Sequence, residues 1–542
     1  MSSRAPTLEQ AQLDELRMLS QQENWSLLEE RSRNLLSDDS NHIDGLELLA
    51  YALQQQGQLE EAADLASKAV SISADRWFPN FIAGLSLKRL GNDTEAYSYL
   101  LQASKISPSD HQTRLLLTEA TAAVDGLEQA ALGYSAYCKA AGIQKEVIVA
   151  PILTVSDYAK KTGMPLLNAG DIENIPYKEP HVYGTPPAVD IITAPSNQPY
   201  VADLANVRIF NQSSIILTED GTVLSDTGGH AKFGHAVSFA YENIVVAQEP
   251  YKLLLNIGGY QTRELEAGIL MSGLASNAYG HWIPEFLPKL QFLQQHPDYK
   301  ELPVIIDAGM PQSHTDLLKH LCDNPLITLE NNESISCKRL LVAPSPTFLP
   351  VEFLPNDIPI HEMPGISPKA LRFIQEKANT LTNSRPTRHI FLARKNMQWR
   401  RLINEDEIIE DLSTLGFEAI YLEDMSTREQ IELFQQAKTI VAPNGSALLN
   451  VIFSSTEVNV LILAQPNLFN WGTYQGPMDE LGYKSICVCG KYAVSESDKH
   501  SNYWVDKHLI RQALADIEVT KRPISQANNS TLLYAAANKS VS

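Results

Sequence analysis

The sequence lacks the long apolar run that a membrane-spanning helix requires. Its apolar stretches are short and are interrupted by polar residues. The first residues, MSSRAPTLEQAQLDELRML, also lack the apolar segment of a secretory signal. We therefore expect no transmembrane segment and a cytoplasmic location.

Basic residues are a minority in this chain. There are 43 Lys and Arg residues against 64 Asp and Glu residues, which gives a formal net charge of −21. Binding to a phosphate backbone needs a concentrated cationic surface, so we expect no nucleic-acid partner. Any local group of cations stands out against this acidic background.

Cysteines are few, odd in number and scattered, which favours a reducing compartment without a disulfide framework. They are Cys138, Cys322, Cys337, Cys487 and Cys489. The last two form a C-x-C in SICVCG, a stretch with the pattern of a strand. Zinc would need two further ligands at matching spacing, and none is visible. We expect structural cysteines and no metal site.

A chain of 542 residues is too long for one hydrophobic core, so two to four domains are expected. Residues 1–145 have the pattern of amphipathic helices with a repeat of 34 residues. Matching positions at this offset carry glycine or alanine: Gly57 and Gly91, Ala62 and Ala96, Ala69 and Ala103. Small residues are needed where paired helices approach closely. The period and these residues resemble the tetratricopeptide repeat, and a generic helical bundle is the alternative.

After residue 146 the sequence changes to short strands with proline and glycine. An irregular lead-in precedes an expected hairpin at Asp220-Gly221. Strands and helices then alternate through 146–375 and again through 376–520, and the tail 521–542 is expected to be poorly ordered. Such alternation predicts an α/β region with parallel, doubly wound sheets. Two of them in tandem suggest two Rossmann-like domains facing a cleft.

In open α/β sheets, ligands bind beyond the carboxyl ends of strands. The first candidate stretch there is RKNMQWRRLINEDE, which follows strand HIFLA and holds four cations: Arg394, Lys395, Arg400 and Arg401. Guanidinium groups bind diphosphates through paired N–H donors. Asn404 has the position of a helix N-cap, and Glu405 lies in the first turn. The alternative is a solvated charged loop.

The second candidate stretch is APNGSALLN, after strand TIV. Asn444, Gly445 and Ser446 lead into a helix whose first N–H groups could bind an anion. The stretch is not a G-x-G-x-x-G fingerprint. A tight strand-to-helix connection without a ligand explains it equally well.

The third candidate stretch is YGHWIPEFLPKL, after strand GILMSGL. Prolines are tolerated near a helix start, so we expect the helix to begin at Pro284 or Glu285, with His281 and Trp282 on the preceding loop. Either His281 or Glu285 could serve as general base. A structural hydrogen bond for His281 and simple N-terminal capping for Glu285 are the alternatives.

Together the three stretches resemble glycosyltransferase family 61, over roughly residues 205–485. The resemblance rests on YGHWIPEFLPKL, ARKNMQWRRLINEDE and REQIELFQQAKTIVAPNGSALLNVIF, which includes Asn450. It implies a GT-B fold and inverting transfer from a nucleotide sugar. The chain departs from the family where Asn444 stands for a frequent histidine and Ser446 for alanine. Strand VNVLILA also ends without the usual acidic residue, which leaves the donor open.

The resemblance also implies roles for the candidate residues. Glu285 or His281 would take the acceptor's proton, and Arg394, Lys395, Arg400 and the N–H groups after Gly445 would stabilise the leaving diphosphate. Asn450 would position the nucleotide or its supporting loop, and we expect the nucleotide to be UDP. No Asp-x-Asp motif lies in a suitable loop, so we expect no metal requirement.

The sequence leaves the acceptor open. We expect a glycan of a surface polysaccharide, made peripheral to a membrane. One alternative is a protein O-glycosyltransferase whose repeats hold a polypeptide, and another is a non-catalytic scaffold of a polysaccharide assembly complex. The helical repeats would recruit the acceptor, a partner protein or a second copy of the chain.

Overall fold

The computed structural model describes residues 8–143, 146–177, 181–184, 192–196, 198–225, 239, 241–347, 366–378, 385–395, 400–466, 477–493 and 501–519. The tail 521–542, which we expected to be poorly ordered, lies outside these residues. So does much of the irregular lead-in between 178 and 191.

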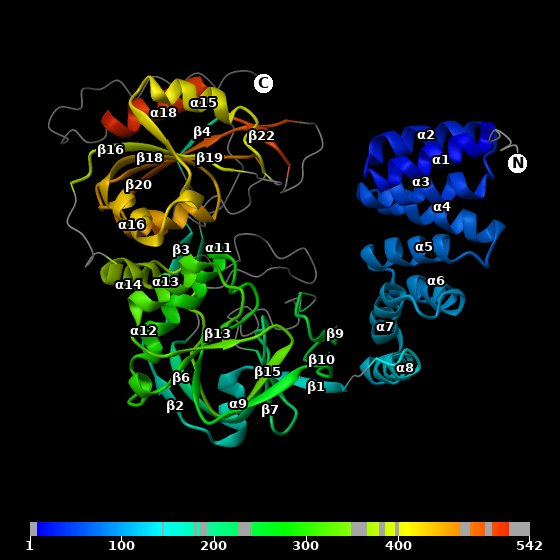
Figure 1. Ribbon diagram of the computed structural model, residues 1–542, viewed down its shortest axis with the longest axis horizontal. Helices are drawn as coiled ribbons and strands as arrows, with labels where there is room; N and C mark the ends of the chain where they lie inside the picture. The colour runs from blue at the N-terminus through cyan, green and yellow to red at the C-terminus, as the bar shows by residue number, and fades with distance from the viewer. Residues whose placement is uncertain are drawn as a thin grey trace, which may run out of the picture.

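The N-terminal region is a stack of antiparallel helices (Figure 1). Its helices are α1 Leu8–Gln21, α2 Trp25–Asp38, α3 Ile43–Gln55, α4 Leu59–Ile72, α5 Trp77–Arg89, α6 Asp93–Ile106, α7 His111–Asp125 and α8 Leu127–Ala140. Helices α2, α4, α6 and α8 begin at intervals of 34 residues, and so do α3, α5 and α7. Each helix contacts the next along the chain. This confirms the predicted all-helical repeat region.

Small residues set the spacing of the helix pairs, as the sequence predicted. Ala62, Ala96 and Ala103 are 0% exposed, because the facing helix leaves no room for a larger side chain. Gly57 and Gly91 have φ angles of 79° and 80°, in the left-handed region that glycine adopts at least cost. The 34-residue repeat therefore follows from one close contact and one turn in each unit.

Gly84 gives a direct test of this packing. A Cβ added at Gly84 would lie 2.6 Å from Cγ of Leu100. We expect Gly84→Ala to destabilise the helical region by about 1–3 kcal/mol through overpacking. Gly133, within α8, is the matched control, since its added Cβ would meet nothing within 4 Å. Gly133→Ala should stabilise by about 0.5–1 kcal/mol. Calorimetric unfolding of both variants checks this, and equal shifts would contradict it.

The larger of the two main sheets has 12 strands among the described residues. They are β1 Val147–Leu153, β2 Leu166–Asn168, β6 Tyr200–Phe210, β7 Ile216–Thr218, β8 Val223–Leu224, β9 Val245–Glu249, β10 Lys252–Asn256, β11 Gln261–Leu265, β12 Gly268–Leu270, β13 Val304–Asp307, β14 Leu326–Leu329 and β15 Glu333–Val342. Strands β7 and β8 form the hairpin predicted at Asp220-Gly221. Gly221 has a φ of 78° in its turn.

This sheet differs from the expected parallel one. Strands β14, β13, β12 and β15 are parallel neighbours, and they are the strands that the alternating pattern predicted. Strand β15 then pairs antiparallel with β6, and β6 pairs antiparallel with β7. The hairpins before residue 268 add antiparallel strands to the parallel core, so the sheet is mixed.

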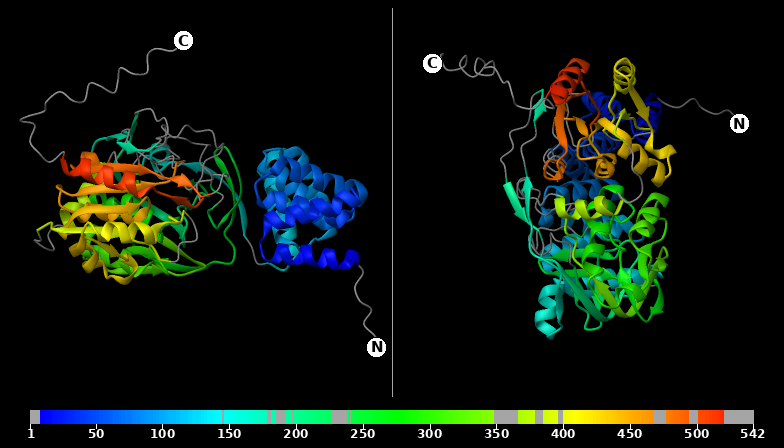
Figure 2. Two further views of the ribbon diagram at one scale, coloured as in Figure 1. Left: turned by 90° about the horizontal axis from the view of Figure 1, so that it is seen from above. Right: turned by 90° about the vertical axis from the view of Figure 1, so that its left-hand side faces the viewer.

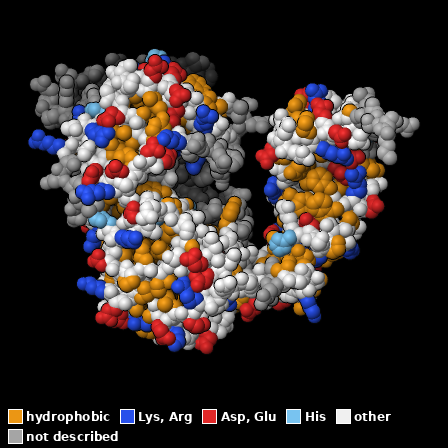
Figure 3. Space-filling view, in the orientation of Figure 1, with side chains coloured by type: hydrophobic (Ala, Val, Ile, Leu, Met, Phe, Trp, Pro, Cys, Tyr) orange, Lys and Arg blue, Asp and Glu red, His pale blue; other side chains and the backbone are white. Residues whose placement is uncertain are grey.

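The helical stack is docked on an edge of this sheet, where α7 and α8 pack against the β9–β10 hairpin (Figure 1). Tyr134 and Leu127 share an apolar cluster with Leu254 of β10. The backbone N–H of Leu127 also donates to Oε1 of Glu249 at 2.8 Å. In Figure 3 a gap separates the helical stack from the α/β region above this junction.

The smaller main sheet is parallel throughout, in the order β17-β16-β18-β19-β20-β4. Its strands are β4 Val182–Tyr183, β16 Arg388–Leu392, β17 Phe417–Ile420, β18 Ala437–Pro443, β19 Asn459–Ala464 and β20 Lys484–Cys489. Strand β20 contains the C-x-C, and all five cysteines are free thiols. Strand β4 comes from the lead-in before residue 200, so the chain crosses between the sheets there.

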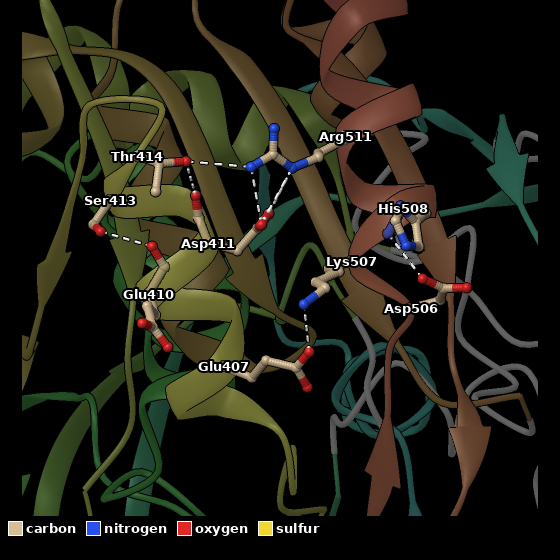
Figure 4. A network of polar contacts seen from close by, with 9 residues as sticks. All are labelled: Glu407, Glu410, Asp411, Ser413, Thr414, Asp506, Lys507, His508 and Arg511. Atoms are coloured by element: carbon tan, nitrogen blue, oxygen red, sulfur yellow. Dashed lines mark hydrogen bonds and ion pairs between the residues drawn. The ribbon is translucent and has the colours of Figure 1, made fainter.

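Helices cover both faces of the smaller sheet (Figures 1 and 2). One face carries α15 Glu405–Ser413 and α18 Lys507–Val519. Arg511 of α18 donates to both carboxylate oxygens of Asp411 on α15, and Lys507 pairs with Glu407 at 2.7 Å (Figure 4). These ion pairs fix α18 beside α15.

The other face carries α16 Thr427–Gln436 and the 3₁₀ helix η7 Ser446–Phe453, with α14 Pro368–Ala378 beside η7. Here the two sheets share one apolar cluster. Trp282 and Phe286 of the first half belong to the same cluster as Leu448 and Phe453 of the second. The two halves of the α/β region therefore pack directly on each other around η7. Within the described residues, no helix is long and apolar enough to cross a bilayer.

Candidate functional site

The order of strands places one ligand-binding crevice in the smaller sheet. Strand β16 lies between β17 and β18, and the chain runs from β16 to β17 on one side before it crosses to β18 on the other. The loops that follow β16 and β18 thus run in opposite directions from the carboxyl ends of these two strands. Such a topological switch point is where open α/β sheets bind ligands. The sequence predicted candidate residues in both loops.

Arg394 bridges the two loops. It follows β16, and its Nη2 donates to the carbonyl oxygens of Pro443 and Asn444 after β18, at 3.0 and 2.8 Å. A Cβ added at Gly445 would lie 2.3 Å from this Nη2. A residue with a Cβ at this position would therefore displace the Arg394 guanidinium from its two carbonyl partners. The φ of 166° does not itself call for glycine, because it is extended backbone that any residue adopts.

The turn after β18 enters the 3₁₀ helix η7. The expected first turn is present, with the Leu448 N–H donating to the Gly445 carbonyl at 3.0 Å. Ser446 is exposed, whereas Asn444 is 7% exposed, and Oδ1 of Asn444 has no hydrogen-bond partner among the described residues. The turn thus offers a hydroxyl and N–H groups beside a guanidinium, a combination suited to an anion.

Asn450 is occupied on both sides of its amide. Its Nδ2 donates to the Ala447 carbonyl at 3.2 Å, and its Oδ1 accepts a hydrogen bond from the Tyr279 hydroxyl at 2.5 Å. The side chain is 2% exposed. Asn450 therefore supports the turn, and in this arrangement its amide does not face the crevice.

The expected helix start at Pro284 or Glu285 is wrong. Helix begins earlier and runs through α11 Tyr279–His281, the π-helix η2 Trp282–Phe286, the 3₁₀ helix η3 Leu287–Lys289 and α12 Leu290–Leu293. Pro284 has no backbone N–H and so interrupts the regular hydrogen bonds of a helix. The wider π-turn accommodates it, with the Leu287 N–H donating to the Trp282 carbonyl five residues earlier. Trp282 is 0% exposed, so it anchors the run in the shared core.

Because the run is helical, His281 and Glu285 lie on one face. His281 Nδ1 is 2.5 Å from Glu285 Oε2, and their side chains are 25% and 12% exposed. Burial lowers the pKa of His281, but the hydrogen bond and the charge of Glu285 raise it more, so the net shift is upward. An imidazole held through Nδ1 by a carboxylate leaves Nε2 to exchange a proton, as in a base with an orienting partner.

Two of the remaining cations, Lys395 and Arg401, line a pocket of about 330 Å³ together with Arg394. Its wall includes Lys395, Arg401, Glu405 and Tyr421. Lys395 is not free, because its Nζ is 2.5 Å from Asp424 Oδ2 and 4.8 Å from the centre of the Tyr421 ring. The hydrogen bond to Asp424 raises the pKa of Lys395, which keeps it charged.

Arg400 is distinctive among these cations. Its backbone has a φ of 54°, and its Nε is buried without a hydrogen-bond partner among the described residues. A buried guanidinium nitrogen without a hydrogen-bond partner is a donor that an anionic ligand could satisfy. The loop residues between Lys395 and Arg400 lie outside the described part of the chain.

Asn404 and Glu405 have structural contacts. Asn404 occupies the N-cap position of α15 as expected, but its side chain does not cap the helix. Its amide instead pairs with both backbone polar groups of Val505, at 2.8 and 3.2 Å. Glu405 accepts from the Arg394 N–H at 3.1 Å, and burial raises the pKa of its carboxyl. Both residues thus shape the loop that carries Arg394.

Asp307, at the end of β13, is a site residue that sequence reasoning missed. It is 1% exposed, and its carboxylate accepts hydrogen bonds from five donors: Asn211 Nδ2, Gln212 N, Ser272 Oγ, Gly273 N and Ser276 Oγ. These donors fix the loop that leads from β12 to Tyr279. The only signal in the sequence was an acidic residue ending the apolar strand VIID.

We expect Asp307→Leu to destabilise the protein by at least about 3 kcal/mol, because a buried group that loses its partner costs about 1–3 kcal/mol and five donors are left here. Asp307→Asn, which keeps one acceptor oxygen, should cost less. Calorimetry of both variants checks the order. A loss as small as that of an exposed control, Asp171→Leu, would contradict a role for Asp307 as anchor.

Among the described residues, no three His, Cys, Asp or Glu side chains are grouped so that they could hold a metal ion. The residues of the candidate site offer cations, backbone N–H groups and an imidazole–carboxylate pair. It suits binding of a phosphorylated ligand with proton transfer nearby.

These features describe an α/β protein with a candidate anion site and a candidate base. The model of the family described as Glycosyltransferase 61 matches residues 279–461. The chain therefore contains a glycosyltransferase 61 domain. The match begins at Tyr279 and includes the helical run, the Arg394 loop and the Gly445 turn. A comparison with curated protein sequences gives no match.

Solved structures similar to the chain are helical-repeat proteins. YrrB, "a TPR protein with an unusual peptide-binding site", is 18% identical with a TM-score of 0.23, and the match covers 24% of this chain and 66% of that one. MamA from Desulfovibrio magneticus RS-1 is 12% identical with a TM-score of 0.23, covering 24% and 72%. The Arabidopsis OM64 TPR domain is 12% identical with a TM-score of 0.20, covering 20% and 91%.

Proposed function

We propose that the protein is an inverting glycosyltransferase that moves a sugar from a nucleotide sugar to a glycan acceptor. One observation carries the proposal. The segment that carries His281 contacts the turn after Gly445, because a Cβ at Gly280 would lie 3.4 Å from Cβ of Ser446. This contact supports a site in which the leaving diphosphate and the base come from the two halves of the α/β region.

The reaction is a single displacement at the anomeric carbon. Nε2 of His281 takes the proton of the acceptor hydroxyl while the oxygen of that hydroxyl forms the new glycosidic bond to the anomeric carbon. The bond from the anomeric carbon to the diphosphate oxygen breaks, and the diphosphate leaves with the electron pair. Arg394, Arg400 and the N–H groups after Gly445 stabilise that charge. Attack from the side opposite the leaving group inverts the anomeric centre.

The arrangement fits a GT-B enzyme in which the smaller, parallel sheet binds the donor and the larger sheet supplies the base. The cations and helix N–H groups provide the charge that a metal would otherwise supply, so we propose a metal-independent enzyme. The 330 Å³ pocket beside Arg394 is our candidate for part of the nucleotide site, with UDP as the favoured nucleotide.

The helical repeats make a second acceptor class worth testing. Because α7 and α8 are docked on the β9–β10 edge, the stack is held in place relative to the α/β region. An acceptor or a partner protein bound to the repeats would be kept near the enzyme. A polypeptide bound there would make the protein a protein O-glycosyltransferase. A second copy of the chain is a further candidate partner.

Thermal shift tests the donor site. UDP, GDP, CMP and dTDP are screened with and without divalent metal, because a ligand of the folded state raises the melting temperature. We expect one nucleotide to stabilise the protein without metal and the Arg394→Ala, Arg400→Ala double variant to lose that shift. Arg428→Ala, whose side chain is 81% exposed, is the control and should keep it. If no nucleotide stabilises the wild type, a non-catalytic scaffold becomes the better account.

A further inference from the structure

Three consecutive residues join the candidate base to the candidate donor turn. The Tyr279 hydroxyl donates to Oδ1 of Asn450 on η7 at 2.5 Å. Gly280 lies against Ser446, the first residue of η7. His281 then carries the imidazole. The donor turn is therefore in direct contact with the segment that aims the base, and the contact spans the two halves of the α/β region.

Asn450, which accepts the hydrogen bond from Tyr279, is itself held in place within η7. Asn450 Nδ2 donates to the Ala447 carbonyl, so the amide that accepts the Tyr279 hydrogen bond also holds the first turns of η7. The Leu448 N–H closes that turn on the Gly445 carbonyl. A change at Gly445 on anion binding would thus move Asn450 with it.

The Tyr279 side of this contact has little freedom to absorb such a movement. The Tyr279 ring packs edge-on against His314, at 5.6 Å between ring centres, and His314 in turn packs on the buried Trp282. Burial lowers the pKa of His314 to about 4, so this ring stays neutral near pH 7. A close-packed side chain transmits a displacement instead of yielding to it.

We propose that Tyr279 is a positioning residue that, through Asn450, couples binding of a nucleoside diphosphate at the Gly445 turn to the placement of His281. The proposal rests on the proposed function. It assigns to Tyr279 a task that neither packing nor catalysis by itself requires. Binding of the donor at the Gly445 turn fixes the position of the His281 imidazole, so His281 reaches its catalytic position only when the donor is bound.

Hydrogen–deuterium exchange separates the two ends of this link. The probe is the nucleoside diphosphate that gives the largest thermal shift among UDP, GDP and dTDP. At about 100 times its Kd, amides that open with the site exchange up to about 100-fold more slowly. In the wild type we expect slower exchange in peptides covering 443–453 and also in those covering 277–290.

The Tyr279→Phe variant removes only the hydroxyl. We expect it to keep the protection of 443–453 and to lose most of that of 277–290. Tyr299→Phe is the matched control, as a buried tyrosine on η4 Tyr299–Glu301 of the same half. It should behave as the wild type.

Two results would overturn the coupling. One is protection of 277–290 that persists in Tyr279→Phe, and the other is wild-type protection confined to 443–453. A different result bears on the donor site itself. If no diphosphate protects 443–453 in the wild type, the proposed donor site is wrong, and the inference falls with it.

Discussion

Replacement of His281 by glutamine should lower the rate of sugar transfer by about 10² to 10⁴, the usual contribution of a general base. Glutamine is polar and helix-compatible, so the helical run from Tyr279 should persist, but its amide cannot accept the acceptor's proton at neutral pH. Initial rates of nucleoside diphosphate release at saturating donor and acceptor measure the effect. The control is His320→Gln, on the exposed face of α13 Gln312–Leu321, and it should leave the rate unchanged.

The pH profile gives the base a second, independent signature. His281 acts as a base only when neutral, and its pKa is raised by Glu285. Activity should therefore fall as the pH drops through a value above the ordinary 6.5 of histidine. Glu285→Gln removes the charge that raises this pKa, so the acid limb should move to lower pH while the plateau rate falls. An unchanged acid limb in Glu285→Gln would show that another group titrates.

Replacement of Arg394 by lysine should have an effect of similar size. The arginine fork donates to the Pro443 and Asn444 carbonyls while remaining beside Gly445. Lysine keeps the charge but is a single point donor that cannot hold this geometry. We expect kcat/KM to fall by about 10² to 10³, the typical loss on removing one donor to a developing negative charge.

The matched variant for this test is Arg388→Lys. Arg388 is at the start of β16, at the opposite end of the same strand, and pairs with Glu418 at 2.7 Å. It should change stability slightly and leave kcat/KM unchanged. Similar losses in the two variants would indicate a general effect on the sheet, and the crevice would then lose its assigned role.

The secondary structure near the site was predictable where patterns are local. The parallel strands from β12 to β15 and from β16 to β19 follow from apolar runs bounded by turn residues. The 34-residue spacing of the helices also followed directly from matched glycines and alanines. Both signals depend on residues close in sequence, so a single sequence is enough to show them.

The start of the helix that carries His281 could not be predicted in the same way. Pro284 normally marks the first turn, but here the π-turn from Trp282 lets the helix begin at Tyr279. The burial of Trp282 in the core shared by both halves stabilises that geometry. Tertiary packing therefore determines where this helix begins, whereas the position of the proline predicts a start several residues later.

The partners of the site residues were equally hidden. Asn404, expected as a helix cap, pairs with Val505 across 101 residues of chain. Asn450, expected to position the nucleotide or its supporting loop, accepts from Tyr279 across 171 residues. The residue types indicate polar contacts, but the partners depend on how the two sheets pack, which no periodicity in the sequence encodes.

Nucleotide-sugar turnover is the most direct test of the central claim that this junction transfers sugar. The full-length protein is incubated with UDP-, GDP- and dTDP-linked hexoses and a surface-polysaccharide acceptor, and release of the nucleoside diphosphate is measured with the anomeric configuration of the product. We predict release from one donor, an inverted product, and near-complete loss of both in His281→Gln. Absence of turnover with every donor, or equal turnover by wild type and His281→Gln, would contradict the proposed mechanism.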